Sequence, residues 1–279
     1  MSMKVMVTGS SGLVGAAAVK RLEAEGAEVV RFDIKHGHDI LDPAQVDKAA
    51  AGCDAIVHAA GGHQPNVEPG QSFITHNVTG NWYVLDAARK VGAKRVVTFS
   101  SVNAIGVFRG EAKPDYLPID DDHPIRPPTA YGQAKRLIEE LCRCFTVTTG
   151  ISTIVFRPPA VLGPERHDRF AKARAADPAA EWTPFWEYGA YIDTRDVAYA
   201  VWAALTCPDP GHVTGLIVAD DSSSTIPPRE LARNLLPEIP WRGPEPIDPR
   251  QSLVRCERIK KALGWTPRYR WEDRGIVER

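Results

Sequence analysis

The feature that most constrains this chain is a glycine-rich turn that directly follows a short apolar run. Residues 8–15 read Thr-Gly-Ser-Ser-Gly-Leu-Val-Gly, and residues 5–7 before them are Val-Met-Val. We expect a buried strand, then a helix whose free N–H groups and partial positive charge suit a dinucleotide pyrophosphate. Gly9 would permit the tight turn, Gly12 would let the backbone approach the phosphates, and Gly15 would let the helix pack closely on the strand.

The acid after the next strand-like run supports that interpretation. Residues 28–32 are β-like, and Asp33 follows at about the distance at which a βαβ nucleotide fold places the acid that hydrogen-bonds an adenosine ribose. A carboxylate there accepts from the 2′-hydroxyl and repels a 2′-phosphate, which favours NAD over NADP. Lys35 and His36 lie nearby and could soften this preference. The alternative is that Asp33 only ends a strand in a turn.

Composition and charge exclude several classes of protein. The chain has 279 residues, enough for one large domain or one and a half, and a formal net charge of −1. It has no basic stripe for nucleic acid, no polybasic cluster for a membrane surface, and no apolar run of transmembrane length or signal-peptide pattern. Five cysteines without a CxxC pair indicate reduced thiols and a cytoplasmic location. His36-Gly-His38 lacks a partner at a metal-ligand spacing, so we predict no metal site.

Short apolar runs alternate with helical stretches over the first two thirds of the chain. We expect strands at residues 4–8, 28–33, 54–58, 94–100 and 151–157, with helices between them. The helical stretches include residues 13–25 and residues 130–145. This alternation is typical of an α/β fold, here a Rossmann-type doubly wound parallel sheet.

The pattern changes after residue 162. Residues 163–190 are rich in Pro, Ala and Trp, residues 191–219 return to strand and helix signals, and residues from 220 onward are rich in Pro and end in a short helix near 255–263. We therefore expect an NAD-binding domain over residues 1–162 plus about 191–219. A small substrate-binding lobe over about 163–190 plus 220–279 would fold over the carboxyl ends of the strands, where open α/β sheets bind ligands.

Tyr131 and Lys135 form the second strong feature, because two residues four apart share one face of a helix. A nearby ammonium favours the phenolate and so lowers the tyrosine pKa from its ordinary value of about 10. Tyr131 could then act as a general base near neutral pH. Ser100 and Ser101 follow the strand at 94–100 and offer a hydroxyl that positions a substrate oxygen. The alternative is that Tyr131 and Lys135 simply lie together on a solvent-exposed face of a helix, without a catalytic role.

These motifs together resemble the extended short-chain dehydrogenases/reductases, also called NAD-dependent epimerase/dehydratases. The resemblance runs from Met3 to about Leu205, with a fainter echo at residues 262–267. The matching segments, in chain order, are Thr8–Gly15, Asp33, Asp39–Asp42, His58–Ala60, Asn77–Gly80, Phe99–Ser101, Tyr131 with Lys135, Arg157-Pro158 and Tyr191–Val197.

The resemblance implies a Rossmann fold, a tightly held NAD, and hydride transfer with Tyr131 as base, assisted by Lys135 and Ser101. Ser101 is preferred to Ser100 because Ile105-Gly106 follows it at the spacing of the family. The cofactor residues expected from the turn and from the resemblance are Gly9, Ser11, Gly12, Leu13, Val14, Gly15, Asp33, Asp39, Ile40, His58, Ala59, Ala60, Asn77, Tyr131, Lys135 and Pro158. The substrate residues expected are Ser101, Asn103, Arg157 and Arg195.

The chain departs from several subclasses of this family. Val102-Asn103 stand where nucleotide-sugar 4,6-dehydratases carry an Asp-Glu pair, which disfavours a dehydratase. Ala160 and Gly189-Ala190 stand where nucleotide-sugar 4-epimerases carry an Asn that contacts substrate and an Arg that grips a diphosphate. Residues 99–106 resemble the uronate dehydrogenase branch in length. The arginine that would grip the diphosphate could be replaced by another, namely Arg166, Arg169, Arg195 or Arg242. A cluster of aromatic residues could stack on a sugar or pack a core, namely Trp182, Phe185, Trp186 and Tyr188.

The function expected is that of an NAD-dependent enzyme acting at a secondary hydroxyl of a sugar-like substrate, of the nucleotide-sugar epimerase type and similar to UDP-glucose 4-epimerases. One alternative is a sugar or uronic acid dehydrogenase that releases NADH. Another is a non-catalytic NAD-binding regulatory protein, although such proteins usually lose the Tyr or the Lys that this chain keeps. Many relatives form a homodimer through the helix bearing the Tyr and the helix before it, and we expect the same here.

Overall fold

The computed structural model describes residues 2–62, 72–108, 112–163, 167, 188–224 and 226–271. Its centre is a six-stranded sheet in the order β2-β1-β3-β4-β5-β8, and every neighbouring pair is parallel. The strands are β1 (Lys4–Thr8), β2 (Glu28–Phe32), β3 (Ala55–His58), β4 (Arg95–Phe99), β5 (Ser152–Arg157) and β8 (His212–Leu216). The chain moves outward from β1 to β2 and then reverses to β3, so the ligand-binding switch point of such sheets lies between β1 and β3.

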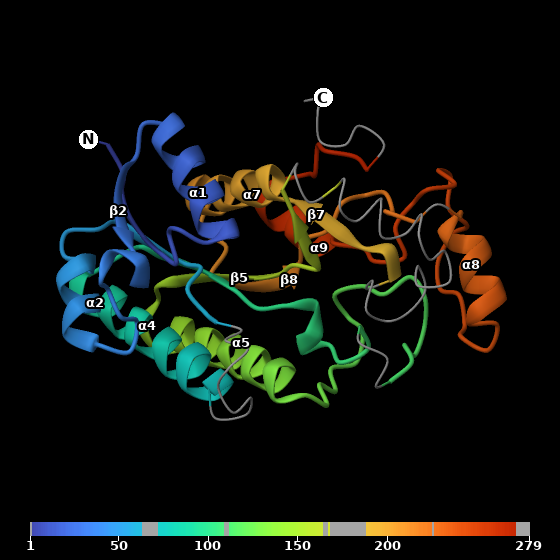
Figure 1. Cartoon of the computed structure of the whole chain (residues 1–279), viewed down its shortest axis with the longest axis horizontal. Helices are drawn as coiled ribbons and strands as arrows, with labels where there is room; N and C mark the ends of the chain where they lie inside the picture. The colour runs from blue at the N-terminus through green and yellow to red at the C-terminus, as the bar shows by residue number, and fades with distance from the viewer. Residues whose placement is uncertain are drawn as a thin grey trace.

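Helices cover both faces of the sheet, with α1, α7 and α9 on one side and α2, α4 and α5 on the other (Figure 1). The two faces follow from the period of two in a strand. Val5 and Val7 pack with the first group of helices, whereas Met6 packs with the second. The helices are α1 (Leu13–Ala24), α2 (Pro43–Ala50), α4 (Gly80–Val91), α5 (Ala130–Thr149), α7 (Thr194–Thr206) and α9 (Glu257–Leu263). The doubly wound parallel sheet expected from the sequence is confirmed.

The predicted strands agree with the structure to within one residue at each end. Helix α1 ends one residue earlier than expected, and α5 runs four residues further, to Thr149, where Gly150 adopts a left-handed conformation. Helix α8 (Pro228–Leu235) was missed, because prolines fill this part of the sequence. A proline at the first position of a helix is well tolerated, since its missing N–H would have no partner there.

The region expected to form a second lobe shares part of its core with the sheet. Helix α9 packs against β8, and Ile259, Leu263 and Trp265 belong to the same buried cluster as β1 and β5. A two-stranded parallel sheet, β6 (Ala160–Leu162) with β7 (Tyr191–Asp193), stands apart from the main sheet. Helix α8 lies at the end of the molecule opposite to β2 (Figure 1). The division of the chain into two parts stays a prediction, and residues 164–166 and 168–187 lie outside the described residues.

Buried aspartates tie the C-terminal segment to this core. Asp196, at the start of α7, accepts hydrogen bonds from the backbone N–H groups of Arg268 and Tyr269 at 2.8 and 3.0 Å. Asp221 accepts from the N–H of Trp271 at 2.8 Å. Buried backbone donors need such partners. Within the described ranges, no helix is both long and apolar enough to cross a lipid bilayer.

We predict that Trp265→Ala destabilises the whole domain. The side chain of Trp265 is fully buried in the core that joins α9 to the sheet, so its removal leaves a large cavity. The free energy of unfolding should fall by about 3–5 kcal/mol in denaturant titrations. Ile247→Ala is the control, because Ile247 is fully exposed and its loss should change that free energy by less than about 0.5 kcal/mol. Equal effects of the two changes would contradict the shared core.

Candidate active site

The glycine-rich turn joins β1 to α1 and packs against the end of β3. Gly9 has a φ of +65°, and a Cβ there would lie 2.6 Å from the backbone N of Ala60. A Cβ on Gly15 would lie 2.1 Å from the carbonyl oxygen of Gly9, so the close contact expected between α1 and the strand is made with the turn itself. Gly12 is the extended N-cap residue of α1 and has no side chain to cap the first N–H groups. These donors therefore remain available to an anion.

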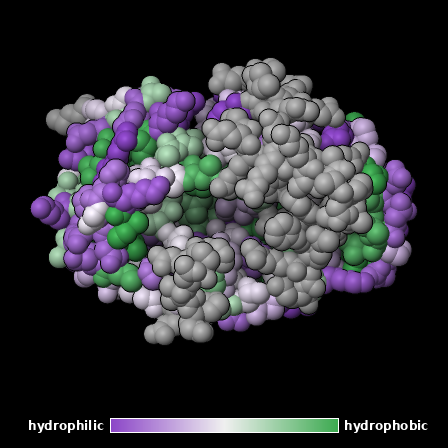
Figure 2. Space-filling view, in the orientation of Figure 1, coloured by the Kyte–Doolittle hydropathy of each residue, from purple (hydrophilic) through white to green (hydrophobic). Residues whose placement is uncertain are grey.

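A cavity of about 390 Å³ opens beside this turn, between the ends of β1, β2 and β3. Most of its lining was expected from the sequence as cofactor-binding. The lining residues are Gly9, Gly12, Phe32, Asp33, Ile34, His38, Asp39, Ile40, Ala59, Ala60, Gly61, Gly62 and His76. In the space-filling view the molecule is hollowed near the middle of the face drawn (Figure 2).

Asp33 ends β2 in a turn and also lies beside the cavity, and its binding of a ribose stays a prediction. Its carboxylate caps a short 3₁₀ turn by accepting from the N–H of Lys35 at 2.9 Å, and it also lines the cavity. The N–H of Ser11, in the glycine-rich turn, donates to its other oxygen at 2.8 Å. Burial would raise the pKa of Asp33, but the two N–H groups and the nearby His36 and Lys35 lower it below its usual range. The carboxylate is therefore ionised beside the turn.

Lys135 is buried, and this distinguishes it from a lysine on a solvated helix face. Its Nζ donates to the carbonyl oxygen of Phe99, the last residue of β4, at 2.9 Å. The Nζ lies 5.7 Å from the centre of the half-buried Tyr131 ring, which Phe73 contacts edge-on with ring centres 5.3 Å apart. Burial lowers the pKa of Lys135 to about 8, and the carboxylate of Glu139 opposes that effect. The phenol thus has a cation within one helical turn.

Ser101 follows β4 at the same edge of the sheet. Its Oγ accepts from the backbone N–H and from the Nδ2 of Asn103, both at 3.2 Å, and both residues are buried. Its neighbour Ser100 instead donates to Glu139 at 2.6 Å. The two serines therefore differ in their partners, since Ser100 bonds Glu139 and Ser101 bonds Asn103. The preference for Ser101 as the catalytic hydroxyl stays a prediction.

Asn77 lies in a π-helical turn, η2 (Ile74–Thr79), that precedes α4. Its Nδ2 donates to the carbonyl of Phe73 at 2.9 Å, whereas its buried Oδ1 has no hydrogen-bond partner among the described residues. A Cβ built on Gly61 would lie 2.9 Å from this oxygen and 3.5 Å from Nζ of Lys135. An acceptor is thus left over where a small-residue turn, α5 and η2 meet. A ribose hydroxyl would satisfy it, which fits the expected cofactor.

His58 ends β3 next to Ala59 and Ala60. Thr8 accepts from the N–H of Ala60 at 3.1 Å, and its hydroxyl lies 2.8 Å from Nδ1 of His58. Burial and then the charge of Lys135 lower the pKa of His58 to about 3, so its ring is neutral. The direction of the Thr8–His58 hydrogen bond depends on which ring nitrogen carries the proton, since the Thr8 hydroxyl can both donate and accept.

Both arginines expected to bind substrate are held by carboxylates. Arg157 at the end of β5 donates from Nε and Nη2 to Glu139 at 2.7 and 2.8 Å, although its buried Nη1 has no partner in the described part of the chain. Arg195 donates to Asp193 twice at 2.8 Å and stacks on Tyr269. Neither lines the cavity, so their substrate roles stay predictions.

Some predicted residues fall in other places. Tyr188 is buried and donates to the carbonyl of Val107 at 2.7 Å, so it packs in the core. The carbonyl of Pro158 accepts from the N–H of Val102 at 3.1 Å, beside Ser101. Five residues named above lie outside the described residues, namely Arg166, Arg169, Trp182, Phe185 and Trp186.

Sequence reasoning missed several residues of the cavity. The ring of His38 stacks on Phe32 at 5.0 Å and 16°, and both line the cavity with His76. His38 was considered only as a metal ligand, although its position beside the expected adenine residues Asp39 and Ile40 was a usable signal. His76 gave no signal, because a π-helical turn does not follow the 3.6-residue period.

A sequence model of the NAD dependent epimerase/dehydratase family matches residues 5–218, which hold nearly all of the geometry described above. The chain belongs to this family. The resemblance inferred from the motifs is thus confirmed, and the unmatched residues are those whose pattern was irregular.

Similar proteins include both epimerases and dehydrogenases. An N-acetyl-alpha-D-glucosaminyl-diphospho-ditrans,octacis-undecaprenol 4-epimerase of Escherichia coli O157:H7 is 29% identical over 174 residues, which is 58% of this chain and 50% of that protein. A uronate dehydrogenase of Pseudomonas putida is 30% identical over 167 residues, 55% of this chain and 59% of that protein. The match therefore spans between half and three fifths of these relatives. A UDP-glucose 4-epimerase from Brucella ovis in complex with NAD has the same fold, with a TM-score of 0.72, 22% identity, and coverage of 99% of this chain and 96% of that one.

We predict that Gly15→Ala disturbs the turn. The added methyl group would meet the Gly9 carbonyl at 2.1 Å, so either α1 or the turn must shift. The free energy of unfolding should fall by about 1–3 kcal/mol. Gly163→Ala is the matched control, since its Cβ would make an ordinary contact of 3.7 Å with Leu13. If both variants unfolded at the parent's denaturant concentration, the close packing of α1 on the turn would be wrong.

Proposed function

We propose that this protein binds NAD and oxidises a secondary hydroxyl of a sugar-like substrate. The observation that carries the proposal is the buried Lys135, one helical turn from Tyr131 and docked on the end of β4 beside the cavity. When bound, NAD supplies the oxidising group, which accepts hydride from the substrate carbon. Family membership, the glycine-rich turn and the unsatisfied Asn77 oxygen support NAD as the cofactor.

Different segments of the chain would bind the pyrophosphate, the two riboses and the adenine of NAD. The N–H groups at the start of α1 would hold the pyrophosphate, and the ionised Asp33 would accept from the ribose hydroxyls. Asn77 and Lys135 would hold the second ribose. Asp39 and Ile40 would border the adenine. The other residues proposed to contact NAD are Gly9, Ser11, Gly12, Leu13, Val14, Gly15, His58, Ala59, Ala60, Tyr131 and Pro158.

The proton is handled by three side chains. Tyr131 takes the proton of the substrate hydroxyl, and the ammonium of Lys135 stabilises the phenolate that makes this possible. Both contacts of Ser101 with Asn103 are accepted by its Oγ, so its O–H is left to donate to the substrate oxygen. That donor holds the oxygen in place while the C–H bond breaks.

Two reactions are compatible with this chemistry. An epimerase of the nucleotide-sugar type would return the hydride to the substrate and show no net change in NAD. A sugar or uronic acid dehydrogenase would release NADH. The second candidate is favoured by the arginines, because Arg157 and Arg195 are paired with carboxylates and Gly189-Ala190 provide no charge for a diphosphate.

We predict that Tyr131→Phe abolishes turnover and leaves NAD binding almost unchanged. The phenylalanine keeps the ring but has no proton acceptor, so the rate should fall at least about hundredfold. Binding is measured by calorimetry, and turnover by NADH absorbance or by product analysis for an epimerase, with sugars, sugar acids and nucleotide sugars as substrates. Tyr83→Phe, on α4, is the control and should retain activity. Activity that survives in Tyr131→Phe would show that the base is another group.

We further propose that residues about 163–190 plus 220–279 form the substrate-binding part, and that the protein works in the cytoplasm. All five cysteines are free thiols, which suits a reducing compartment.

We also propose a homodimer through α4 and α5, which lie on the same side of the sheet (Figure 1). Trp82 on α4 is 48% exposed, and Leu137 and Val147 on α5 are 47% and 74% exposed. On α5, Leu137 is exposed whereas Ala134 and Ile138 are buried, so Leu137 is available to a partner. Exposed large apolar side chains on both helices are what such an interface would cover.

We predict that Trp82→Lys converts the dimer to a monomer. A charge placed at the centre of an apolar interface loses its hydration without gaining a partner. Sedimentation should give the mass of two chains for the parent and of one chain for the variant. Ile247→Lys, at an exposed apolar site far from α4, should keep the parent mass. A parent protein that sediments as one chain would refute the proposed interface.

A further inference from the structure

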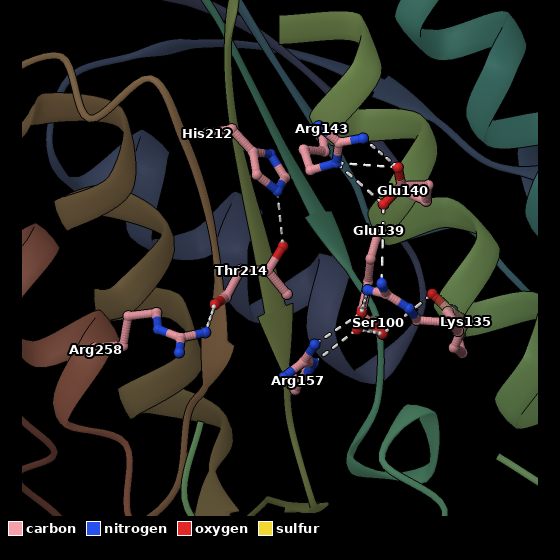
Figure 3. A network of polar contacts seen from close by, with 10 residues as sticks. Ser100, Lys135, Glu139, Glu140, Arg143, Arg157, His212, Thr214 and Arg258 are labelled. Carbon is pink, nitrogen blue, oxygen red and sulfur yellow. Dashed lines mark hydrogen bonds and ion pairs between the residues drawn. The ribbon is translucent and has the colours of Figure 1, made fainter. Parts of the chain in front are cut away.

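Glu139 occupies the turn of α5 after Lys135 and is almost completely buried, with 1% of its surface exposed. Its Oε1 accepts from Ser100 Oγ at 2.6 Å and from Arg157 Nε at 2.7 Å. Its Oε2 accepts from Arg157 Nη2 at 2.8 Å and from Arg136 Nη1 at 3.0 Å. Figure 3 shows these contacts converging between α5 and the ends of two strands.

The position of this carboxylate gives it two effects on the neighbouring site. Ser100 follows β4 and Arg157 ends β5, so one side chain joins both strand ends to α5. Ser100 precedes the proposed catalytic Ser101, and Phe99 before it receives the Lys135 ammonium. A shift of Glu139 would therefore move both the hydroxyl and the cation relative to Tyr131.

A buried ion pair is a costly way to join elements, because both charges lose their hydration and apolar side chains of similar volume often serve as well. The charge of Glu139 therefore has a consequence that simple packing would not provide. Burial favours the neutral amine of Lys135, and Glu139 is the carboxylate that opposes this. Burial likewise raises the pKa of Glu139, but Arg157, Ser100 and Arg136 together hold it below its usual range. Glu139 thus remains ionised.

The other titratable groups near the pair come from four elements. They are Tyr131, Arg136 and Cys142 on α5, His58 on β3, Arg157 on β5 with Asp121 beside it, and His212 on β8. His58 is neutral, and the thiol of Cys142 has its pKa raised by burial to about 12. Near neutral pH, the negative charge that most favours the ammonium form of Lys135 is therefore that of Glu139.

We propose that Glu139 is a positioning residue, whose buried carboxylate clamps Ser100 after β4 and Arg157 at the end of β5 against α5 and supplies a negative charge one helical turn from Lys135. Its consequence for turnover rests on the proposed function. Its effect on Lys135 does not, since it can be measured without NAD or substrate.

The direct test is the titration of Lys135 in Glu139→Gln. Protein labelled with ¹³C at the lysine ε carbon is followed by NMR between pH 6 and 11, and Lys135→Met identifies the signal. The parent midpoint should lie at about 8. In Glu139→Gln it should fall by at least about one pH unit, a tenfold loss of proton affinity. An unchanged midpoint in the folded variant would overturn the proposal.

Glu140→Gln is the matched control on the next residue of the same helix. Glu140 is largely exposed and pairs with Arg143, so its removal should leave the Lys135 midpoint in place (Figure 3). Glu139→Asp keeps the charge on a shorter side chain and should restore a midpoint near that of the parent. A fall as large in Glu140→Gln as in Glu139→Gln would show that the effect is not specific, and would also overturn the proposal.

Glu139→Gln leaves Arg157 buried without its carboxylate, so this variant could fail to fold. Glu139→Gln with Arg157→Gln leaves no unpaired guanidinium, and its reference is Arg157→Gln alone, so that the positive charge is absent from both proteins. The double variant should have the lower Lys135 midpoint of the two, and equal midpoints would overturn the proposal without relying on the single variant.

The pH profile of turnover separates this proposal from the proposed function. Parent activity should decline as pH rises through about 8, since the ammonium is lost there. In Glu139→Gln the decline should begin at a lower pH, in step with the NMR midpoint. If the midpoint moved and the activity profile did not, the coupling of Glu139 to Lys135 would stand and the role of Lys135 in turnover would be wrong.

Discussion

The buried ammonium of Lys135 is the interaction on which the rest of the site depends. A charged amine with 7% of its surface exposed has lost most of its hydration, and the Phe99 carbonyl at 2.9 Å and the carboxylate of Glu139 offset that loss. Because the carbonyl closes β4, the same hydrogen bond fixes the start of α5 against that strand. Tyr131, one turn earlier, and Ser101, two residues after Phe99, are placed by this one contact.

The topology explains why segments far apart in the chain meet at this point. In a parallel sheet all carboxyl ends lie at one edge, and the reversal of strand order between β1 and β3 leaves a space there that neither crossover helix fills. Gly9 packs on Ala60 across that space, and Gly61 lies against Asn77 and Lys135. At Gly9 a small residue is a steric requirement, because a Cβ would overlap the backbone of Ala59 and Ala60, whereas at Gly61 a Cβ would crowd the side-chain oxygen of Asn77.

The sheet could be predicted because β3 and β5 are buried at every position and read as continuous apolar or small runs. The glycine-rich turn, Asp33 and the Tyr131–Lys135 pair were visible because their spacing is local. Glu139 was not, since a Glu beside Glu140 on a helix resembles a solvated pair, and the partner Arg157 lies 18 residues away. The exposure of Leu137 could not be predicted either, because periodicity does not show which side of a helix a sheet will cover.

The arginines near β5 and β7 bear on which substrate this edge of the sheet can hold. A guanidinium that donates twice to a buried carboxylate has much of its positive charge offset by that partner, although three of its five N–H donors remain, and this holds for Arg157 and for Arg195. Binding a diphosphate removes water from its charged oxygens, so the site must offer several free donors or cations in place of that water. Arg157 Nη1 is one buried donor without a partner in the described residues, which suits a single acceptor such as one carboxylate oxygen or a hydroxyl. Among the described residues, the pairing of Arg157 and Arg195 with carboxylates is therefore what supports the proposed sugar or uronic acid substrate over the proposed nucleotide sugar.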